Sequence, residues 1–303
     1  MPGYIDKLLQ RFQHKTLTQA KSPSIYTPPK YGSHVQFPAI DTSPALSPAA
    51  TTELQEVVGS VLYYARAIDA TMLPTVCALS SDQATPTQQL ELQANRLLAY
   101  AKSYPNNKLV FKKSGMVQII QSDVSFLSRS HARSVAGGIS YFGFLDSTSD
   151  FINGNIYAFS KVIDVVVASV GEGEYASVFL NAQAGEHIRT ILLALGHPQP
   201  PTTIYCDNEC AVGLANDTVK MKRSKSIDMR FHWIRDRIKQ GHFVVTWIKG
   251  ANNLADFFTK ALPVHQHQLL MSKLVFTPLP STSHFAMQRG KRYLSRNKAL
   301  LQQ

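Results

Sequence analysis

The sequence predicts an α/β protein in which a small helical subdomain precedes a domain built around a β-sheet. Two observations support this fold class. Between residues 51 and 105 the apolar residues recur at helical spacing. After residue 106, three strand-like segments lead into a helix, a strand, two helices, a strand and a helix. A hydrophobic share of 44% in 303 residues is sufficient for a buried core.

The first 105 residues contain a predicted helix, a linker and a helical subdomain. Residues 4–12, YIDKLLQRF, predict a short amphipathic helix. The following stretch up to residue 50 is rich in Pro, Ser and Thr and has no clear periodicity, so we expect a linker. LQEVVGSVLYYARAI and TQQLELQANRLLAYAKSY predict helices between prolines. We therefore expect a helical subdomain over residues 51–105.

Residues 106–262 carry the predicted sheet. MVQIIQSD, AGGISYFGFL and NIYAFSKV predict three strands, and Glu172 to Leu195 predicts a long helix that ends before Pro198. TTIYCDN followed by ECAVGLAND predicts a strand-to-helix junction. A helix over residues 224–240, the strand HFVVTWI and a last helix NNLADFFTKAL complete this domain.

Composition and the C-terminal segment limit the possible functions. Residues 263–303 are basic and show no core-facing stripe, which is compatible with disorder. The chain has 31 Lys and Arg against 20 Asp and Glu, a net charge of +11 that favours a polyanionic partner such as nucleic acid. Its three cysteines lack zinc-ligand spacing. With no secretory signal and no run of ~18 apolar residues, a cytoplasmic location is expected.

Four acidic residues stand where predicted strands end or predicted helices begin: Asp123, Glu174, Asp207 and Asp256. Single acids at strand ends are commonly solvated loop residues. If all four converged at one sheet edge, however, they would repel one another and require hard divalent cations such as Mg²⁺ or Mn²⁺. Two such ions ~3.5–4 Å apart can activate a water molecule and stabilise the leaving oxygen of a phosphodiester.

The segments around these acids are QSDVSFLSRSHARSVAGG, FSKVIDVVVASVGEGEYASVFLNAQ, IYCDNECAVGLANDTVKMKRSKSIDMRFHWIRDRI and NNLADFFTKALP. They resemble the ribonuclease H domain of copia-type retrotransposon polyproteins. Upstream, LQEVVGSVLYYARAIDATMLPTV resembles the helical connection that precedes this domain, and residues 1–50 resemble the end of a reverse transcriptase with a linker. The resemblance implies a ribonuclease H-like fold, a five-stranded mixed sheet with flanking helices, in a C-terminal fragment of such a polyprotein.

The resemblance also implies an activity, which is metal-dependent endonucleolytic cleavage of the RNA strand of RNA–DNA hybrids. Asp123 would bridge two Mg²⁺ or Mn²⁺ ions, Glu174 and Asp207 would complete the first metal site, and Asp256 would hold the second. The implied partners are the hybrid and the polymerase and integrase domains of the polyprotein, in virus-like particles if the element is intact. Polymerase activity is not expected, because the YxDD motif is absent.

Three positions leave alternatives or departures from the family pattern. Glu172 is an alternative to Glu174, although the succession Glu-Tyr-Ala-Ser from residue 174 fits the family pattern better. Many copia-type elements place a second acid two residues after the first, where this chain has Ser125. Other ribonucleases H carry a His in the loop before the last acid, where this chain offers Lys249. The resemblance therefore leaves the rate of turnover open.

Basic residues and alternative functions complete the prediction. Arg223, Arg230 and Arg237 recur every seven residues and predict either a ridge that follows a phosphate backbone or a solvated helix face. Together with Lys249 and Lys260 they are the candidate nucleic-acid contacts.

One alternative function is a catalytically inactive, nucleic-acid-binding remnant of a truncated element. A transposase or integrase is disfavoured, because that class has an Asp, Asp, Glu order.

Overall fold

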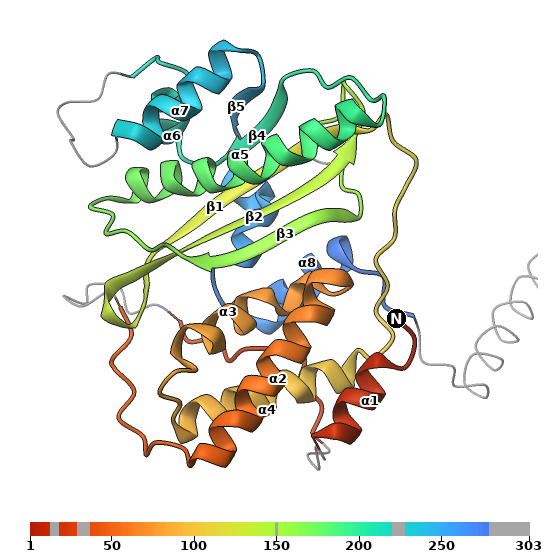
Figure 1. Ribbon diagram of the computed structural model, residues 1–303, viewed down its shortest axis with the longest axis vertical. Coiled ribbons are helices and arrows are strands. Elements are labelled where there is room, and N and C mark those ends of the chain that lie inside the picture. The colour runs from red at the N-terminus through yellow and green to blue at the C-terminus, as the bar shows by residue number, and fades with distance from the viewer. Residues whose placement is uncertain (13–17, 29–36, 149–150, 220–227, 279–303) are drawn as a thin grey trace, which may run out of the picture.

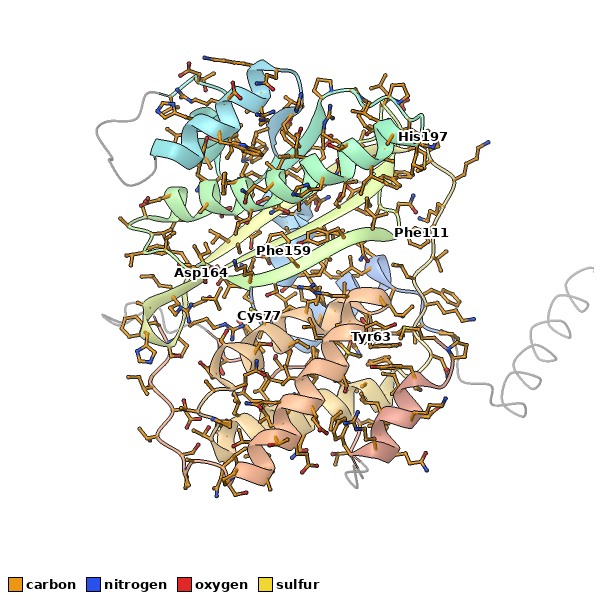
Figure 2. All side chains as sticks on the ribbon, viewed as in Figure 1. Tyr63, Cys77, Phe111, Phe159, Asp164 and His197 are labelled. Atoms are coloured by element: carbon orange, nitrogen blue, oxygen red, sulfur yellow. The ribbon has the colours of Figure 1, made fainter. Side chains whose placement is uncertain are left out.

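A helical part and a sheet part of the chain lie one above the other (Figure 1). Side chains from both parts fill the space between them (Figure 2). For residues 228–231 only the backbone is described. The structure is a computed structural model of the 303-residue chain, and it describes residues 1–12, 18–28, 37–148, 151–219 and 228–278.

The helical part packs the helices α1 to α4 around an apolar centre. Helix α2 begins at Pro48, three residues before the start of the predicted helical subdomain, because the side chain of Ser47 accepts a hydrogen bond from the backbone N–H of Ala50. Tyr64 of α2 is among the largest buried side chains of this centre. The bounds are α1 Tyr4–Arg11, α2 Pro48–Ala67, η1 Ala70–Met72, α3 Leu73–Asp82 and α4 Gln88–Ser103.

In the described part of the chain, five strands form one mixed sheet in the order β3-β2-β1-β4-β5. Strands β1, β2 and β3 pair antiparallel, whereas β4 runs parallel to β1 and β5 runs parallel to β4. The predicted fold class, a five-stranded mixed sheet with flanking helices, is confirmed. The bounds are β1 Val117–Arg129, β2 Arg133–Gly143, β3 Asn155–Val162, β4 Thr202–Cys206 and β5 Phe243–Trp247.

Helices α5, α6 and α7 cover one face of the sheet (Figure 1). Helix α5 lies close against β1 at Gly185, where an added Cβ would come within 2.7 Å of Ile120 Cδ1. A glycine in the middle of a helix is unfavourable by itself, so close packing explains its presence here. The bounds are α5 Val170–Ala194, α6 Glu209–Ala215 and α7 Asp228–Lys239.

The opposite face of the sheet packs against the helical part through the turn η4, Leu254–Phe258. Phe258 of η4 and Tyr141 of β2 belong to the same buried cluster as the apolar centre of the helical part. The expected α-helix over NNLADFFTKAL was wrong, since this segment forms the 3₁₀ turns η3, Gly250–Asn252, and η4. The cause is Asn253, whose side chain caps the N–H of Ala255 and starts a new turn inside the segment.

The expectation of irregular structure from Pro263 onward was wrong for the residues nearest the sheet. Residues 264–274 form α8, Val264–Leu274, which buries His267, Leu270, Met271 and Leu274. A histidine within this stripe obscured its apolar face in the sequence. Phe276 then pairs with Lys108 through two backbone hydrogen bonds of 2.8 and 2.9 Å. Residues 279–303 lie outside the described residues.

Among the described helices, none combines the length and the apolar character that crossing a membrane requires.

Candidate active site

Asp123 lies within β1, directly opposite Gly137 of β2, so its expected place at the end of a strand was wrong: pairing with β2 continues β1 beyond it. Its side chain is 3% exposed, and the hydroxyl of Thr259 donates a hydrogen bond to its Oδ2. A Cβ at Gly137 would approach Thr259 Cγ2 to 2.7 Å and Phe258 Cβ to 2.8 Å. Glycine at position 137 therefore allows the end of η4 to lie close enough to the sheet for Thr259 to hold Asp123.

On the other face of β1, a polar seam, the hydrogen-bonded side chains of Ser122, Ser177 and Asn181, holds α5 against the strand. Ser177 of α5 donates to the backbone carbonyl of Asp123 at 2.7 Å, and Ser122 donates to the Ser177 hydroxyl at 3.0 Å. The amide of Asn181 donates to the Ser122 hydroxyl at 3.0 Å. An added Cβ at Gly138 would lie 1.8 Å from Asn181 Oδ1, so this glycine makes room for the seam. The start of α5 is thereby held in a fixed position relative to Asp123.

Two glutamates in the first turns of α5 have different surroundings. Glu172 is only partly buried, and its carboxylate accepts a hydrogen bond from the N–H of Ala168 at 2.7 Å, so it caps the helix N-terminus. Glu174 is 4% exposed and interacts electrostatically with Asp123 and Asp207. Of the two glutamates, the structure brings Glu174 to the other acids.

Asp207 directly follows β4, which runs parallel to β1. Because parallel strands end at the same edge of a sheet, its carboxylate reaches the neighbourhood of Asp123. The indole N–H of Trp247 donates to the backbone carbonyl of Asp207 at 3.1 Å. An added Cβ at Gly250 would lie 3.0 Å from Asp207 Oδ2, so the glycine leaves space for the carboxylate.

Asp256 is carried by η4, whose position depends on Asn253. The side chain of Asn253 donates to the backbone carbonyl of Ser122 at 2.9 Å and accepts from the N–H of Ala255 at 3.1 Å. These bonds fasten the start of η4 to β1 beside Asp123. The carboxylate of Asp256 forms an ion pair with the ammonium of Lys260.

The acids in this site oppose one another's ionisation. Burial, followed by repulsion from Asp256, raises the pKa of Asp123 to about 7. Burial, followed by repulsion from Asp123 and Asp207, raises the pKa of Glu174 to about 9. The pKa of Asp207 is also raised, chiefly by burial. Asp123, Glu174 and Asp207 therefore share one poorly solvated site, in which the neighbouring positive charge does not offset burial and repulsion.

The chemistry of this site fits a hard divalent cation. A carboxylate oxygen of Glu174, one of Asp207 and the Sγ of Cys206 lie within 4.8 Å of one another. Burial and the neighbouring Glu174 raise the pKa of the Cys206 thiol far above its ordinary value, so it stays protonated and is a poor ligand. The carboxylate oxygens remain, and they are the ligands that Mg²⁺ and Mn²⁺ prefer.

One of the predicted basic residues, Lys260, lies at the acids, and a second, Lys249, precedes a glycine that borders one of them. Lys260 pairs with Asp256 and also interacts electrostatically with Asp123 and Asp207. Lys249 is exposed and directly precedes Gly250, which borders the Asp207 carboxylate. Lys260 therefore borders the acids with its side chain, and Lys249 borders Asp207 through the backbone of the next residue.

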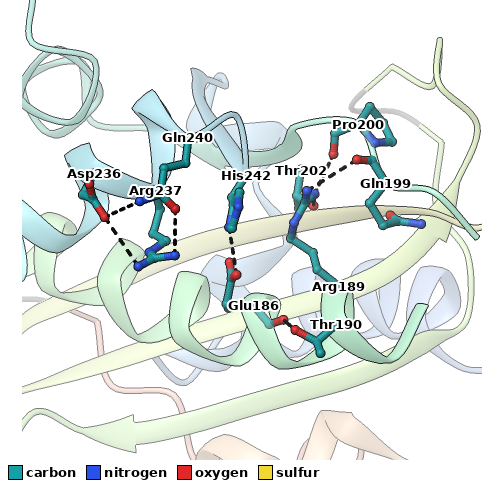
Figure 3. Close-up of polar contacts among 10 residues, drawn as sticks. All are labelled: Glu186, Arg189, Thr190, Gln199, Pro200, Thr202, Asp236, Arg237, Gln240 and His242. Atoms are coloured by element: carbon teal, nitrogen blue, oxygen red, sulfur yellow. Dashed lines mark hydrogen bonds and ion pairs between the residues drawn. The ribbon is translucent and has the colours of Figure 1, made fainter. Parts of the chain in front are cut away.

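Arg237 lies elsewhere, near the beginning of β5, whereas the acids gather near the end of that strand. Its guanidinium donates to Gln240 at 2.9 Å and pairs with Asp236 (Figure 3). It also lies 5.6 Å from the centre of the Trp233 ring. The guanidinium of Arg237 therefore interacts with neighbouring residues and not with the four acids of the site. Arg223 and the side chain of Arg230 lie outside the described residues.

Three polar residues that support the site were not singled out from the sequence. Thr259 holds Asp123, Asn253 fastens η4, and Gln121 accepts a hydrogen bond from the N–H of Leu254 at 2.7 Å. A partial signal existed for Gln121, which lies two residues before Asp123 and therefore on the same face of β1. Thr259 and Asn253 carried no such signal, because their partners are distant in the sequence.

Comparison with known proteins confirms the resemblance to retrotransposon polyproteins. The chain is 30% identical over 232 residues, 76% of its length, to the retrovirus-related Pol polyprotein from transposon RE1 of Arabidopsis thaliana. It is 31% identical over 119 residues, 39% of its length, to the retrovirus-related Pol polyprotein from transposon TNT 1-94 of Nicotiana tabacum. The chain spans 15% and 9% of the lengths of these two relatives.

No protein-family model matches the chain. Among solved structures, the foamy viral protease-reverse transcriptase in complex with an RNA/DNA hybrid is similar with a TM-score of 0.43 and 11% identity. That likeness covers 82% of this chain and 27% of the viral one.

Proposed function

From the similarity to transposon Pol polyproteins and from the acidic site, we infer that the chain is a ribonuclease H. It hydrolyses the RNA strand of RNA–DNA hybrids and uses two Mg²⁺ or Mn²⁺ ions. The observation that carries this proposal is the convergence of Asp123, Glu174, Asp207 and Asp256 from four different elements at one poorly solvated place. Such a cluster is unfavourable without cations and suited to holding them.

In this proposal each acid has a separate role at the metals. Asp123 would contribute to both metal sites, Glu174 and Asp207 would complete one of them, and Asp256 would contribute to the other. When bound, the ions supply an activated water and stabilise the leaving oxygen, which yields a 3′-hydroxyl and a 5′-phosphate. Thr259 keeps the Asp123 carboxylate in place, since its hydroxyl donates to Oδ2.

Substrate recognition in this proposal rests on the backbone of the hybrid. Lys260 lies beside the acids and Lys249 precedes the glycine next to Asp207, and in this proposal both offer positive charge to the phosphates. The 2′-hydroxyls and the shape of the duplex distinguish an RNA–DNA hybrid from DNA. Arg223, Arg230 and Arg237 stay candidates for a more distant backbone contact. The remaining polymerase and integrase domains of a Pol polyprotein are the proposed protein partners.

A cleavage assay tests this proposal directly. The full chain is incubated with Mg²⁺ and a hybrid whose RNA strand is end-labelled, beside Asp123→Asn, Asp207→Asn and the control Asp146→Asn. Asp146 is exposed in the loop after β2, which ends opposite Val117 at the start of β1, away from Asp123 in the middle of that strand. Wild type and the Asp146 variant should cleave, and the two site variants should retain less than about 1% of the rate.

Two results would contradict the proposed activity. Equal cleavage by all four proteins would point to a contaminating nuclease. Absence of cleavage by the wild type, with salt-sensitive hybrid binding that survives both site substitutions, would instead favour the inactive binding remnant.

A further inference from the structure

Lys260 lies inside the acidic site and not only at its rim. Its ammonium pairs with Asp256, four residues earlier, and interacts electrostatically with Asp123 and Asp207 as well. In return, Lys260 lowers the pKa of Asp123 and of Asp207. One side chain of the protein therefore already supplies positive charge to three of the four carboxylates.

The backbone around Lys260 keeps the ammonium in this place. The preceding residue, Thr259, is 1% exposed and hydrogen-bonded to Asp123. Two residues further on, Leu262 is buried in the core that the sheet shares with the helical part. Lys260 also borders a small pocket with Ser24 and Thr75 of the helical part, whose hydroxyls are hydrogen-bonded to each other. The lysine is thus anchored on both sides, while its own side chain is 49% exposed and retains space to turn outward.

An ammonium and a divalent metal compete for the same carboxylate oxygens. Repulsion among buried carboxylates destabilises the metal-free protein, and an ammonium at Asp256 offsets part of it. A divalent ion offers twice the charge and can coordinate several oxygens at once, which an ammonium cannot do. The ion gains access to the Asp256 oxygens only if the ammonium leaves them.

We propose that Lys260 is a tethered counter-ion that occupies the Asp256 side of the acidic site and is displaced when a divalent metal binds there. This inference rests on the proposed two-metal function and adds a regulated step to it. Lys260 thereby sets the metal concentration at which this side of the site becomes occupied. Once displaced, its ammonium faces the solvent, where a phosphate of the hybrid approaches.

Metal titration without any nucleic acid tests the proposal. Binding of Mn²⁺ to the full chain is measured by calorimetry for wild type, Lys260→Met, Lys260→Arg and Lys273→Met. The Met substitution retains the apolar stem and removes the charge, and the Arg substitution retains the charge. Lys273 is exposed on α8, so its variant controls for the lower net charge of the protein.

The Lys260→Met variant should bind its weaker Mn²⁺ ion about tenfold more tightly than wild type, because no ammonium has to be displaced. Lys260→Arg should retain the wild-type affinity to within about threefold, and Lys273→Met should match wild type. Thermal melting gives a second readout. In EDTA, Lys260→Met should melt at a lower temperature than wild type, and saturating Mn²⁺ should remove that difference.

Three results would overturn the proposal. The first is equal Mn²⁺ affinity in all four proteins. The second is a loss of melting temperature in Lys260→Met that is the same with and without Mn²⁺, which would mark a purely structural lysine. The third is unchanged Mn²⁺ affinity with weaker hybrid binding in Ca²⁺, which would make Lys260 a phosphate contact alone. If no protein binds Mn²⁺, the two-metal function itself fails, and this inference with it.

Discussion

Gly137 and Asp123 face each other across the β1–β2 pair, and the absence of a side chain at Gly137 admits Thr259 to Asp123. A residue without functional groups therefore decides whether a candidate metal ligand is held in place. The same position also allows Phe258 to pack against the sheet.

Substitution of Gly137 by Ala should destabilise the protein by about 1–3 kcal/mol, because the new methyl group would overlap Thr259 and Phe258. The measurement is urea unfolding in EDTA followed by circular dichroism. Gly59, in the middle of α2, is a matched control, since an added Cβ there meets no atom within 4 Å. Gly59→Ala should stabilise the protein by about 0.5–1 kcal/mol. An unchanged midpoint for Gly137→Ala would contradict the close packing of η4.

Replacing Thr259 by Val should raise the pKa of Asp123 above its wild-type value of about 7, because a hydrogen bond that favours the carboxylate is lost. The cleavage rate should then decline more at pH 7 than at pH 9, because the Asp123 carboxyl group of the variant ionises only at a higher pH. The measurement is the pH profile of the cleavage rate at subsaturating Mg²⁺, where protonation of Asp123 competes with metal binding. Thr190→Val, on the exposed side of α5, removes a hydroxyl away from the acids and should leave the profile in place. Identical profiles for both variants would rule out a positioning role for Thr259.

The metal-free protein should lose stability as the pH rises. The folded-state pKa values of Asp123, about 7, and Glu174, about 9, lie above their ordinary values. A group of this kind contributes stability that is fully present below its unfolded pKa and is lost as the pH passes through its folded pKa. Melting temperatures in EDTA should therefore fall between about pH 5 and pH 9. Saturating Mg²⁺ should flatten this slope, and so should Asp123→Asn in EDTA. A melting temperature that rises over this range would refute the clustering of the acids.

Asp69 should be important for the stability of the helical part. It is fully buried, accepts hydrogen bonds from the backbone N–H of Thr71 at 3.1 Å and from the amide of Asn107 at 2.7 Å, and its pKa is raised by burial. Asp69→Ala leaves these buried donors unpaired and should cost about 3 kcal/mol. Asp69→Asn retains an acceptor and should cost less. Equal stability of both variants and wild type in urea unfolding would contradict the role of this network.

Much of the fold could be predicted because the periods of helices and strands are local properties of a sequence. The order of strands and helices through β5 followed from such patterns. The predictions failed where a contact from elsewhere overrode the local pattern. Asn253 caps a turn inside the expected last helix, and α8 acquires its buried face only by packing onto the helical part.

The candidate site likewise has features that the sequence predicted and features that only the tertiary structure decided. The sequence by itself determined that Asp207 follows a strand and that Glu174 lies near the start of a helix, and the residues around the four acids indicated the family. Only the tertiary structure decided that Glu174 joins the other acids while Glu172 caps a helix. It also decided that Lys260 enters the site and that Arg237 does not. The physical reason is that electrostatic interactions depend on distance in space, and the sheet brings together residues that lie far apart along the chain.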